Sequence, residues 1–355
     1  MNVLDYLKKY KDVSFKEMAF NEIDALAFAN FSYVDFNALK LDKEKVDSFY
    51  LARLINDYQP NSNDSERKLN YLKIAKYLCE GKRYNKARFA HFRKIRDTSS
   101  EKQFQAITIL FMDFIYISYC GTDATTLGWK EDCNMAILNI VPSEIEAIKY
   151  ANMVMNKHWF RPVYLGGHSK GGRLAITAAK GATNKKRIAA IFSFDAPNYP
   201  LKVYDAEYKK IDSKILAYAP NESIIGRLMN EYHQKRVVKS TNSLLFQHDS
   251  FSWLVDDKTF DYDYGYSEKS TRIVHAINHA LMTYDEETKR QFIDFFFDGF
   301  EKMNLKTLPN ENEFISYFAK RIPSLIGIWK GSSKENRSAV KKIAFDILKD
   351  YFFSK

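Results

Sequence analysis

The chain has 355 residues, 46% of them hydrophobic, which is enough for one large α/β domain with additions or for two smaller domains. It contains no run of about 18 uncharged apolar residues, and residues 1–11 mix charged with apolar side chains, so we expect neither a membrane-spanning helix nor a signal peptide. Lys and Arg exceed Asp and Glu by 54 − 44 = 10, but they are spread along the chain without a nucleic-acid motif, so we expect no nucleic-acid partner. The cysteines, Cys79, Cys120 and Cys133, fit no disulfide or metal-ligand pattern, which favours a reducing, cytoplasmic setting.

The first hundred residues are predicted to be mainly helical. Apolar residues recur at three- and four-residue spacings over 22–31 and 66–79. From about residue 103 the period changes to two, because apolar residues alternate over 104–110, and β-branched and aromatic residues fill 114–119. We therefore expect two strands here, joined by a tight turn near Asp113.

The middle of the chain alternates between helix and strand patterns. The predicted elements are, in order, a helix at 143–156, a strand at 162–165, a glycine-rich turn at 166–172, a helix at 174–180, and strands at 188–194, 214–219 and 236–240. Strands separated by helices at this spacing predict an α/β fold with a mostly parallel sheet flanked by helices.

The end of the chain is again predicted to be helical, over 272–282, 286–302, 312–319 and 334–351. The sequence thus divides into a mainly helical segment at 1–100 packed on the core, an α/β core at 101–266, and a helical segment at 267–355. The last segment is placed to form a cap over the core.

The segment GGHSKGG at 166–172 carries the strongest chemical signal, because it contains the G-x-S-x-G pattern around Ser169. A serine becomes a nucleophile when it is held exposed beside a base, with donors ready for an oxyanion. A strand is predicted before this motif and a helix after it, which is the context that the motif requires. The alternative is a glycine-rich turn that only packs tightly or binds phosphate. In the first case the backbone N–H of Lys170 is one oxyanion donor.

A serine nucleophile needs a base and an acid, which in this kind of fold follow it in the chain. Asp195 comes directly after the strand predicted at 188–194, where it is either the acid or a plain turn former. For the base we favour His248, which lies between a strand-like stretch and an aromatic cluster, over His233 in a basic segment. His275 and His279 have metal-ligand spacing, but without a third ligand they are interpreted as helix-face residues.

Together these segments resemble bacterial lipase-like serine hydrolases related to the class three (fungal-type) triacylglycerol lipases. The similarity extends over about residues 20–260. It rests on CGTD at 120–123 with GWKED at 128–132, GGHSKGG at 166–172, FDAP at 194–197, SIIG at 223–226 and QHD at 247–249.

The resemblance also implies roles for residues outside the elbow. In class three lipases the hydroxyl residue of a Phe-Arg-Gly-Thr or Phe-Arg-Gly-Ser stretch supplies an oxyanion donor, and this role maps onto Thr122, although Tyr-Cys replaces Phe-Arg here. The acid of those lipases would fall near Glu222 or Ser223, whereas Asp195 matches the pancreatic-lipase arrangement. We expect Asp195 to be the acid, with Glu222 as the alternative.

These observations lead us to expect a serine carboxylic-ester hydrolase, a lipase or carboxylesterase, that uses Ser169, His248 and Asp195 and needs no cofactor or metal. The expected substrate is a small-molecule or lipid ester, with an anionic membrane surface as a further partner, because the chain is basic. The expected location is the cytoplasm or the periphery of a membrane. Two alternatives remain, an inactive binding or regulatory protein of the same fold and an acyltransferase or thioesterase with the same triad.

Overall fold

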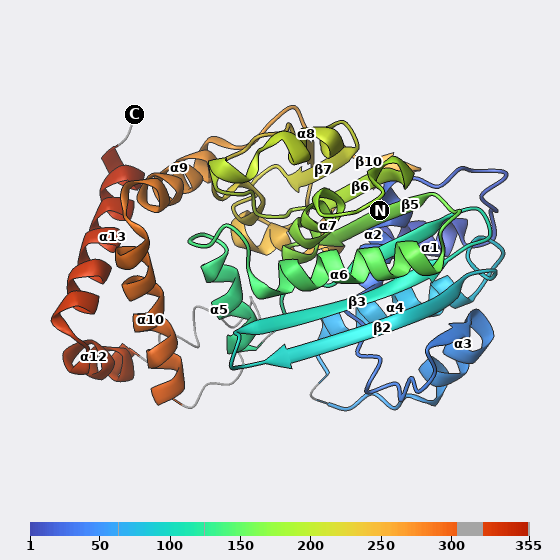
Figure 1. Cartoon of the computed structure of the whole chain (residues 1–355), viewed down its shortest axis with the longest axis horizontal. Coiled ribbons are helices and arrows are strands. Elements are labelled where there is room, and N and C mark those ends of the chain that lie inside the picture. The colour runs from blue at the N-terminus through green and yellow to red at the C-terminus, as the bar shows by residue number, and fades with distance from the viewer. Residues whose placement is uncertain (63, 124, 304–321, 354–355) are drawn as a thin grey trace.

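The computed structural model describes residues 1–62, 64–123, 125–303 and 322–353. Within these residues the centre is an eight-stranded sheet whose spatial order follows the chain order (Figure 1). Its strands are β1 (Lys45–Asp47), β2 (Arg88–Asp97), β3 (Lys102–Leu110), β4 (Ile115–Tyr119), β5 (Val163–His168), β6 (Ile188–Phe194), β7 (Ile215–Pro220) and β8 (Arg236–Val238). The strands β1 to β4 pair antiparallel, and β4 to β8 pair parallel. The predicted α/β fold with a mostly parallel sheet is confirmed.

The register of the parallel strands brings their carboxyl ends to one edge of the sheet. His168 at the end of β5 pairs with Phe194 at the end of β6, which in turn pairs with Tyr218 in β7. Residues that directly follow β5 and β6 are therefore neighbours, although the intervening helix separates them in sequence. In open α/β sheets this edge is where ligands bind.

Helices cover both faces of the sheet. On one face lie α1 (Val3–Tyr10), α2 (Glu22–Phe31), α3 (Ser48–Asp57) and α4 (Glu66–Cys79), and on the other α6 (Pro142–Lys157), α7 (Lys170–Lys180) and α8 (Ala206–Asp212) (Figure 1). Both faces need a layer of helices, because successive side chains of a strand such as β6 point to opposite faces and are apolar on both. Phe192 and Phe194 pack among the first group of helices, while Ile191 packs among the second.

Shorter elements complete the core. Helix α5 (Thr126–Asn134) follows β4, and β9 (Val255–Asp256) and β10 (Thr259–Phe260) form a separate hairpin. The 3-10 helices are Lys185–Arg187, Leu201–Val203, Ile225–Arg227, Leu244–His248 and Ser250–Ser252.

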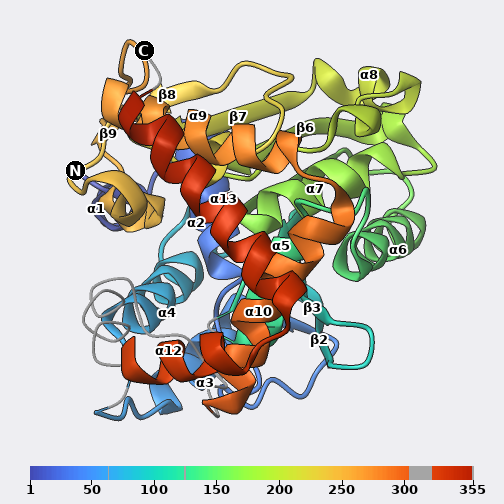
Figure 2. The same ribbon diagram turned by 90° about the vertical axis from the view of Figure 1, so that its left-hand side faces the viewer.

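The C-terminal helices form an additional layer beyond α5, at one end of the molecule (Figures 1 and 2). They are α9 (Glu268–Thr283), α10 (Glu286–Lys302), α12 (Ile322–Gly331) and α13 (Lys334–Phe353). Helix α10 packs on α5, where Lys130 Nζ lies 3.8 Å from Asp294 Oδ1, and Asn278 of α9 donates to the carbonyl of Arg227 at 2.9 Å. No helix in the described ranges is both long and apolar enough to cross a membrane. The helix predicted at 312–319 lies outside the described residues.

The first hundred residues contain two strands that the sequence did not predict, β1 and β2. Strand β2 joins the sheet through β3, so the sheet begins before residue 101. Its alternation is interrupted by a bulge between Ala90 and Arg93, where His91 has a φ of 57°. The division of the chain at residues 100 and 266 remains a prediction.

Candidate active site

Ser169 lies in a sharp turn between β5 and α7, with φ 59° and ψ −135°. A non-glycine residue rarely adopts a positive φ, and such strain is typical of a nucleophile elbow. The turn also requires a close approach of the backbone. A Cβ at Gly167 would lie 2.3 Å from the carbonyl carbon of Gly171, and a Cβ at Gly171 would lie 2.2 Å from the carbonyl oxygen of Tyr119. Glycine is therefore required at both positions, because any side chain would clash with the neighbouring backbone.

The structure brings Asp195 and His248 together at the same edge of the sheet. Asp195 follows β6 directly with a φ of 47°, is 1% exposed, and its Oδ2 accepts a hydrogen bond from His248 Nδ1 at 2.7 Å. Ser169 directly follows the neighbouring strand β5, and its backbone N–H donates to the carbonyl of Phe194 at 2.8 Å. Serine, histidine and carboxylate thus come from three adjacent segments.

Glu222, the alternative acid, has a different set of contacts. Its Oε2 accepts a hydrogen bond from the backbone N–H of Leu244 at 2.9 Å, and its own N–H donates to the side chain of Gln247 at 2.8 Å. Glu222 therefore supports the backbone of the 3-10 helix that ends at His248.

His168 is buried beside His248 and holds the loop that carries it. Its Nε2 lies 2.8 Å from the carbonyl oxygen of His248, so this nitrogen carries the proton and donates. Its Nδ1 is then the acceptor for the Tyr33 hydroxyl at 3.1 Å. Burial lowers the pKa of His168 well below the usual value of 6.5, and the nearby His248 and Arg67 act in the same direction, which fits this neutral form. The sequence did not predict this role, because the partners are distant along the chain.

The proposed oxyanion residues lie where β4 and the elbow approach each other. Thr122 donates its hydroxyl to Asp132 of α5, and burial raises the pKa of the Asp132 carboxyl. A Cβ at Gly121 would lie 2.1 Å from the Tyr33 hydroxyl and 2.7 Å from the carbonyl of His168. Lys170 is the first residue of α7, and N–H groups at a helix start have no acceptor within the helix.

Two buried cations anchor the helix that follows the elbow. Lys170 is 1% exposed, and its Nζ contacts the side chain of Gln103 and lies 3.1 Å from Glu131 Oε2. Arg173 is fully buried, and its Nε donates to Glu144 Oε1 at 3.0 Å. These pairs tie α7 to α5 and α6. The sequence does not predict that Lys170 and Arg173 are buried or that they pair with Glu131 and Glu144.

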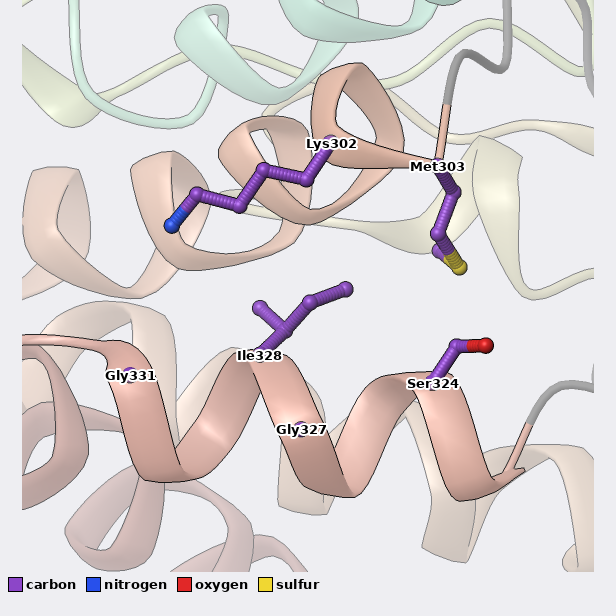
Figure 3. A pocket seen from close by; sticks show the side chains of 6 residues that line it. All are labelled: Lys302, Met303, Ser324, Gly327, Ile328 and Gly331. Carbon is purple, nitrogen blue, oxygen red and sulfur yellow. The ribbon is translucent and has the colours of Figure 1, made fainter.

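A pocket with a volume of about 540 Å³ lies away from this edge of the sheet, between α10 and α12 (Figure 3). It is lined by Lys302, Met303, Ser324, Gly327, Ile328 and Gly331, none of which belongs to the elbow or to the loop of His248. Among the residues that the structure describes, no group of three or more His, Cys, Asp or Glu side chains is arranged for a metal ion. The pair His275 and His279 stacks on the face of α9, where His279 contacts Asp350 of α13.

The Mbeg1-like family profile matches residues 78–298, more than half of the chain. The chain belongs to the Mbeg1-like family. This family is lipase-like, which agrees with the coarser part of the expected relationship but does not specify the class three or bacterial group. A search of curated proteins found no match. In this Mbeg1-like protein the match includes the elbow, Asp195, Thr122 and His248, whereas α12 and α13 lie beyond it.

Proposed function

We propose that this Mbeg1-like protein is a serine carboxylic-ester hydrolase with Ser169, His248 and Asp195 as its catalytic triad. The observation that carries the proposal is the 2.7 Å contact between His248 Nδ1 and the buried Asp195 carboxylate, beside a serine in a strained strand-to-helix turn. The membership of a lipase-like family supports the same reaction class.

In the proposed reaction, Ser169 Oγ attacks the acyl carbon of the ester while His248 takes the hydroxyl proton. Asp195 holds the imidazole in the tautomer that has its proton on Nδ1 and stabilises the imidazolium. The tetrahedral oxyanion receives hydrogen bonds from the backbone N–H groups of Lys170 and Thr122, because the Thr122 hydroxyl already donates to Asp132. Collapse expels the alcohol, which takes the proton from His248. Water then attacks the acyl-enzyme with the same base and releases the carboxylic acid.

We further propose that the ester carries a substantial apolar acyl chain and is met at an anionic lipid surface. On α13, Phe345 and Leu348 are 67% and 57% exposed, and Lys341, Lys342 and Lys349 are exposed beside them. Apolar side chains of this kind bury into the boundary between headgroups and acyl chains, while lysines are attracted to anionic lipid. The C-terminal helices would then cap the core on the side from which substrate arrives.

A fluorophosphonate probe tests the proposed nucleophile, because it reacts covalently with activated serines. We expect the wild-type protein to be labelled and to hydrolyse p-nitrophenyl esters, and Ser169→Ala to lose labelling and at least about 10³-fold in rate with unchanged circular dichroism. Ser143→Ala is the matched control, since Ser143 is also buried and its hydroxyl has no hydrogen-bond partner among the described residues. A folded wild-type protein without labelling or turnover would show an inactive binding protein instead.

A further inference from the structure

The acid of the proposed triad has a second buried partner at the end of β7. Ser223 is 1% exposed, and its Oγ lies 2.5 Å from Asp195 Oδ1, the carboxylate oxygen that does not face His248. The backbone N–H of Gly226 donates to the same Oγ at 3.2 Å. Because Gly226 already supplies a proton to this oxygen, the hydroxyl proton of Ser223 is directed at Asp195.

The hydrogen bonds therefore have one defined direction. Gly226 donates to Ser223, Ser223 donates to Asp195 Oδ1, and His248 Nδ1 donates to Asp195 Oδ2. Each carboxylate oxygen is engaged by a different residue, so the plane of the carboxylate is fixed from both sides. Without the Ser223 hydroxyl, Asp195 Oδ1 would be buried without a donor, which raises the free energy of the folded state. The carboxylate could then rotate to find another donor and turn away from His248.

The backbone of Gly226 closes this small compartment. A Cβ at Gly226 would lie 2.1 Å from Asp195 Oδ1 and 3.0 Å from Ser223 Oγ, so no larger residue fits without moving the carboxylate. The buried ammonium group of Lys235 lies behind the same turn, where it donates to the carbonyl of Gly226 and to Asn198 Oδ1 at 2.6 Å. Ser223 thus belongs to a buried, hydrogen-bonded shell around the acid.

We infer that Ser223 is a positioning residue that fixes Asp195 for proton transfer by His248. The inference rests on the proposed function, and it assigns to the end of β7 a role in holding the acid. Ser223 acts through Asp195 and makes no contact with the substrate in this scheme. Its loss should therefore reduce kcat with little change in KM.

Paired variants at this position separate the hydroxyl from the space it fills. Thr keeps a hydroxyl and Val has nearly the same shape without one. We expect Ser223→Val and Ser223→Ala to lose about 10- to 100-fold in kcat, with KM within about twofold, and Ser223→Thr to lie at least about fivefold above Ser223→Val. Equal kcat for Thr and Val, or a kcat of Ser223→Ala within twofold of wild type, would overturn the inference.

A double-mutant cycle asks whether Ser223 acts through Asp195. In an Asp195→Ala background, Ser223→Ala should change the residual rate by less than about twofold, because the group that it positions is gone. The same loss in both backgrounds would instead mean a general structural role and would contradict the inference.

A readout that does not depend on turnover keeps this test separate from that of the proposed function. The Nδ1 proton of His248, held between imidazole and carboxylate, should give a low-field proton resonance in wild type and Ser223→Thr that broadens or disappears in Ser223→Ala. If the protein hydrolyses no ester but this pattern holds, the hydrolase proposal fails and the positioning of Asp195 stands. If ester turnover is seen and the resonance is the same in all variants, only the inference about Ser223 fails.

Discussion

Asp195 and Glu222 both lie near His248, yet they act on different parts of its segment. Asp195 contacts the imidazole, whereas Glu222 contacts the backbone N–H of Leu244. We expect Asp195→Asn to lose activity by a factor on the order of 10⁴, because the amide favours the wrong histidine tautomer. Glu222→Gln keeps an oxygen for Leu244 and should stay within about tenfold of wild type. Steady-state kinetics on one ester compare the two, and similar losses would argue against Asp195 as the acid.

Only some residues of this site could be predicted from the sequence. Ser169 is indicated by a local pattern, and Asp195 by its position directly after a strand, so both follow from short stretches of chain. The roles of His168 and Ser223 depend on contacts with His248 and Asp195 that form only when distant segments pack. No periodicity or motif encodes such contacts.

At the scale of elements, a buried carboxylate joins the two first helices to the segment before β2. Asp24 in α2 accepts hydrogen bonds from Arg83 Nε at 2.9 Å, the Tyr84 hydroxyl at 2.5 Å and the Tyr6 hydroxyl of α1 at 3.2 Å. The side chains of Asp24 and Arg83 are both 0% exposed. This network fixes α1 and α2 against the rest of the core.

Removal of that carboxylate should be strongly destabilising. Asp24→Ala leaves the Arg83 charge buried without its counter-ion, and we expect a loss of about 3–5 kcal/mol in the free energy of unfolding, measured with urea. The exposed pair of Lys9 and Asp257 is the control, because Lys9→Met breaks a solvent-screened pair and should leave the free energy of unfolding nearly unchanged. Comparable effects of the two substitutions would contradict this interpretation of the network.

The elements differ in how well the sequence predicts them. Strand β6 is found with its predicted bounds, because its apolar side chains serve both faces of a buried sheet. Strand β2 was missed, since its bulge breaks the alternation and basic residues such as Arg93 and Arg96 occupy it. A period-two pattern can be recognised only where the strand keeps its register.

For the whole molecule, buried neutral histidines make stability depend on pH. Burial lowers the pKa of His233 to about 4, with a smaller effect from Lys235, and its Nδ1 lies 2.8 Å from the Tyr208 hydroxyl. Between about pH 6.5 and pH 4 the unfolded chain binds a proton that the folded chain does not, so stability falls as the pH falls through this range.

Urea titrations at pH 7 and pH 5 test this linkage. Wild type should lose about 1 to 2 kcal/mol more than His233→Phe between these two pH values. His275→Phe, at an exposed position of α9, is the control for exchanging an imidazole for a phenyl ring. An identical pH dependence in wild type and His233→Phe would show that His233 titrates normally in the folded protein.

The proposed lipid surface is also a property of the whole molecule. We expect the protein to sediment with vesicles that contain anionic lipid at low salt and to be released as salt rises. The double variant Phe345→Asp with Leu348→Asp should bind such vesicles at least about tenfold more weakly, while its hydrolysis of a short soluble ester is unchanged. Absence of vesicle binding, with activity that falls as the acyl chain lengthens, would refute the lipid substrate but not the esterase.

Helix α2 has a consequence for how the chain is made in the cell. Every residue from Ile23 to Phe31 is buried, and the strands that cover this helix, β4, β5, β6 and β10, are all synthesised later. At about 5–20 residues per second, a ribosome needs on the order of ten seconds to pass from α2 to the end of β5. During that time an almost wholly apolar segment lacks β5 and β6, two of the strands that cover it. The nascent chain should therefore depend on chaperones near the ribosome more than a protein whose sheet is synthesised first.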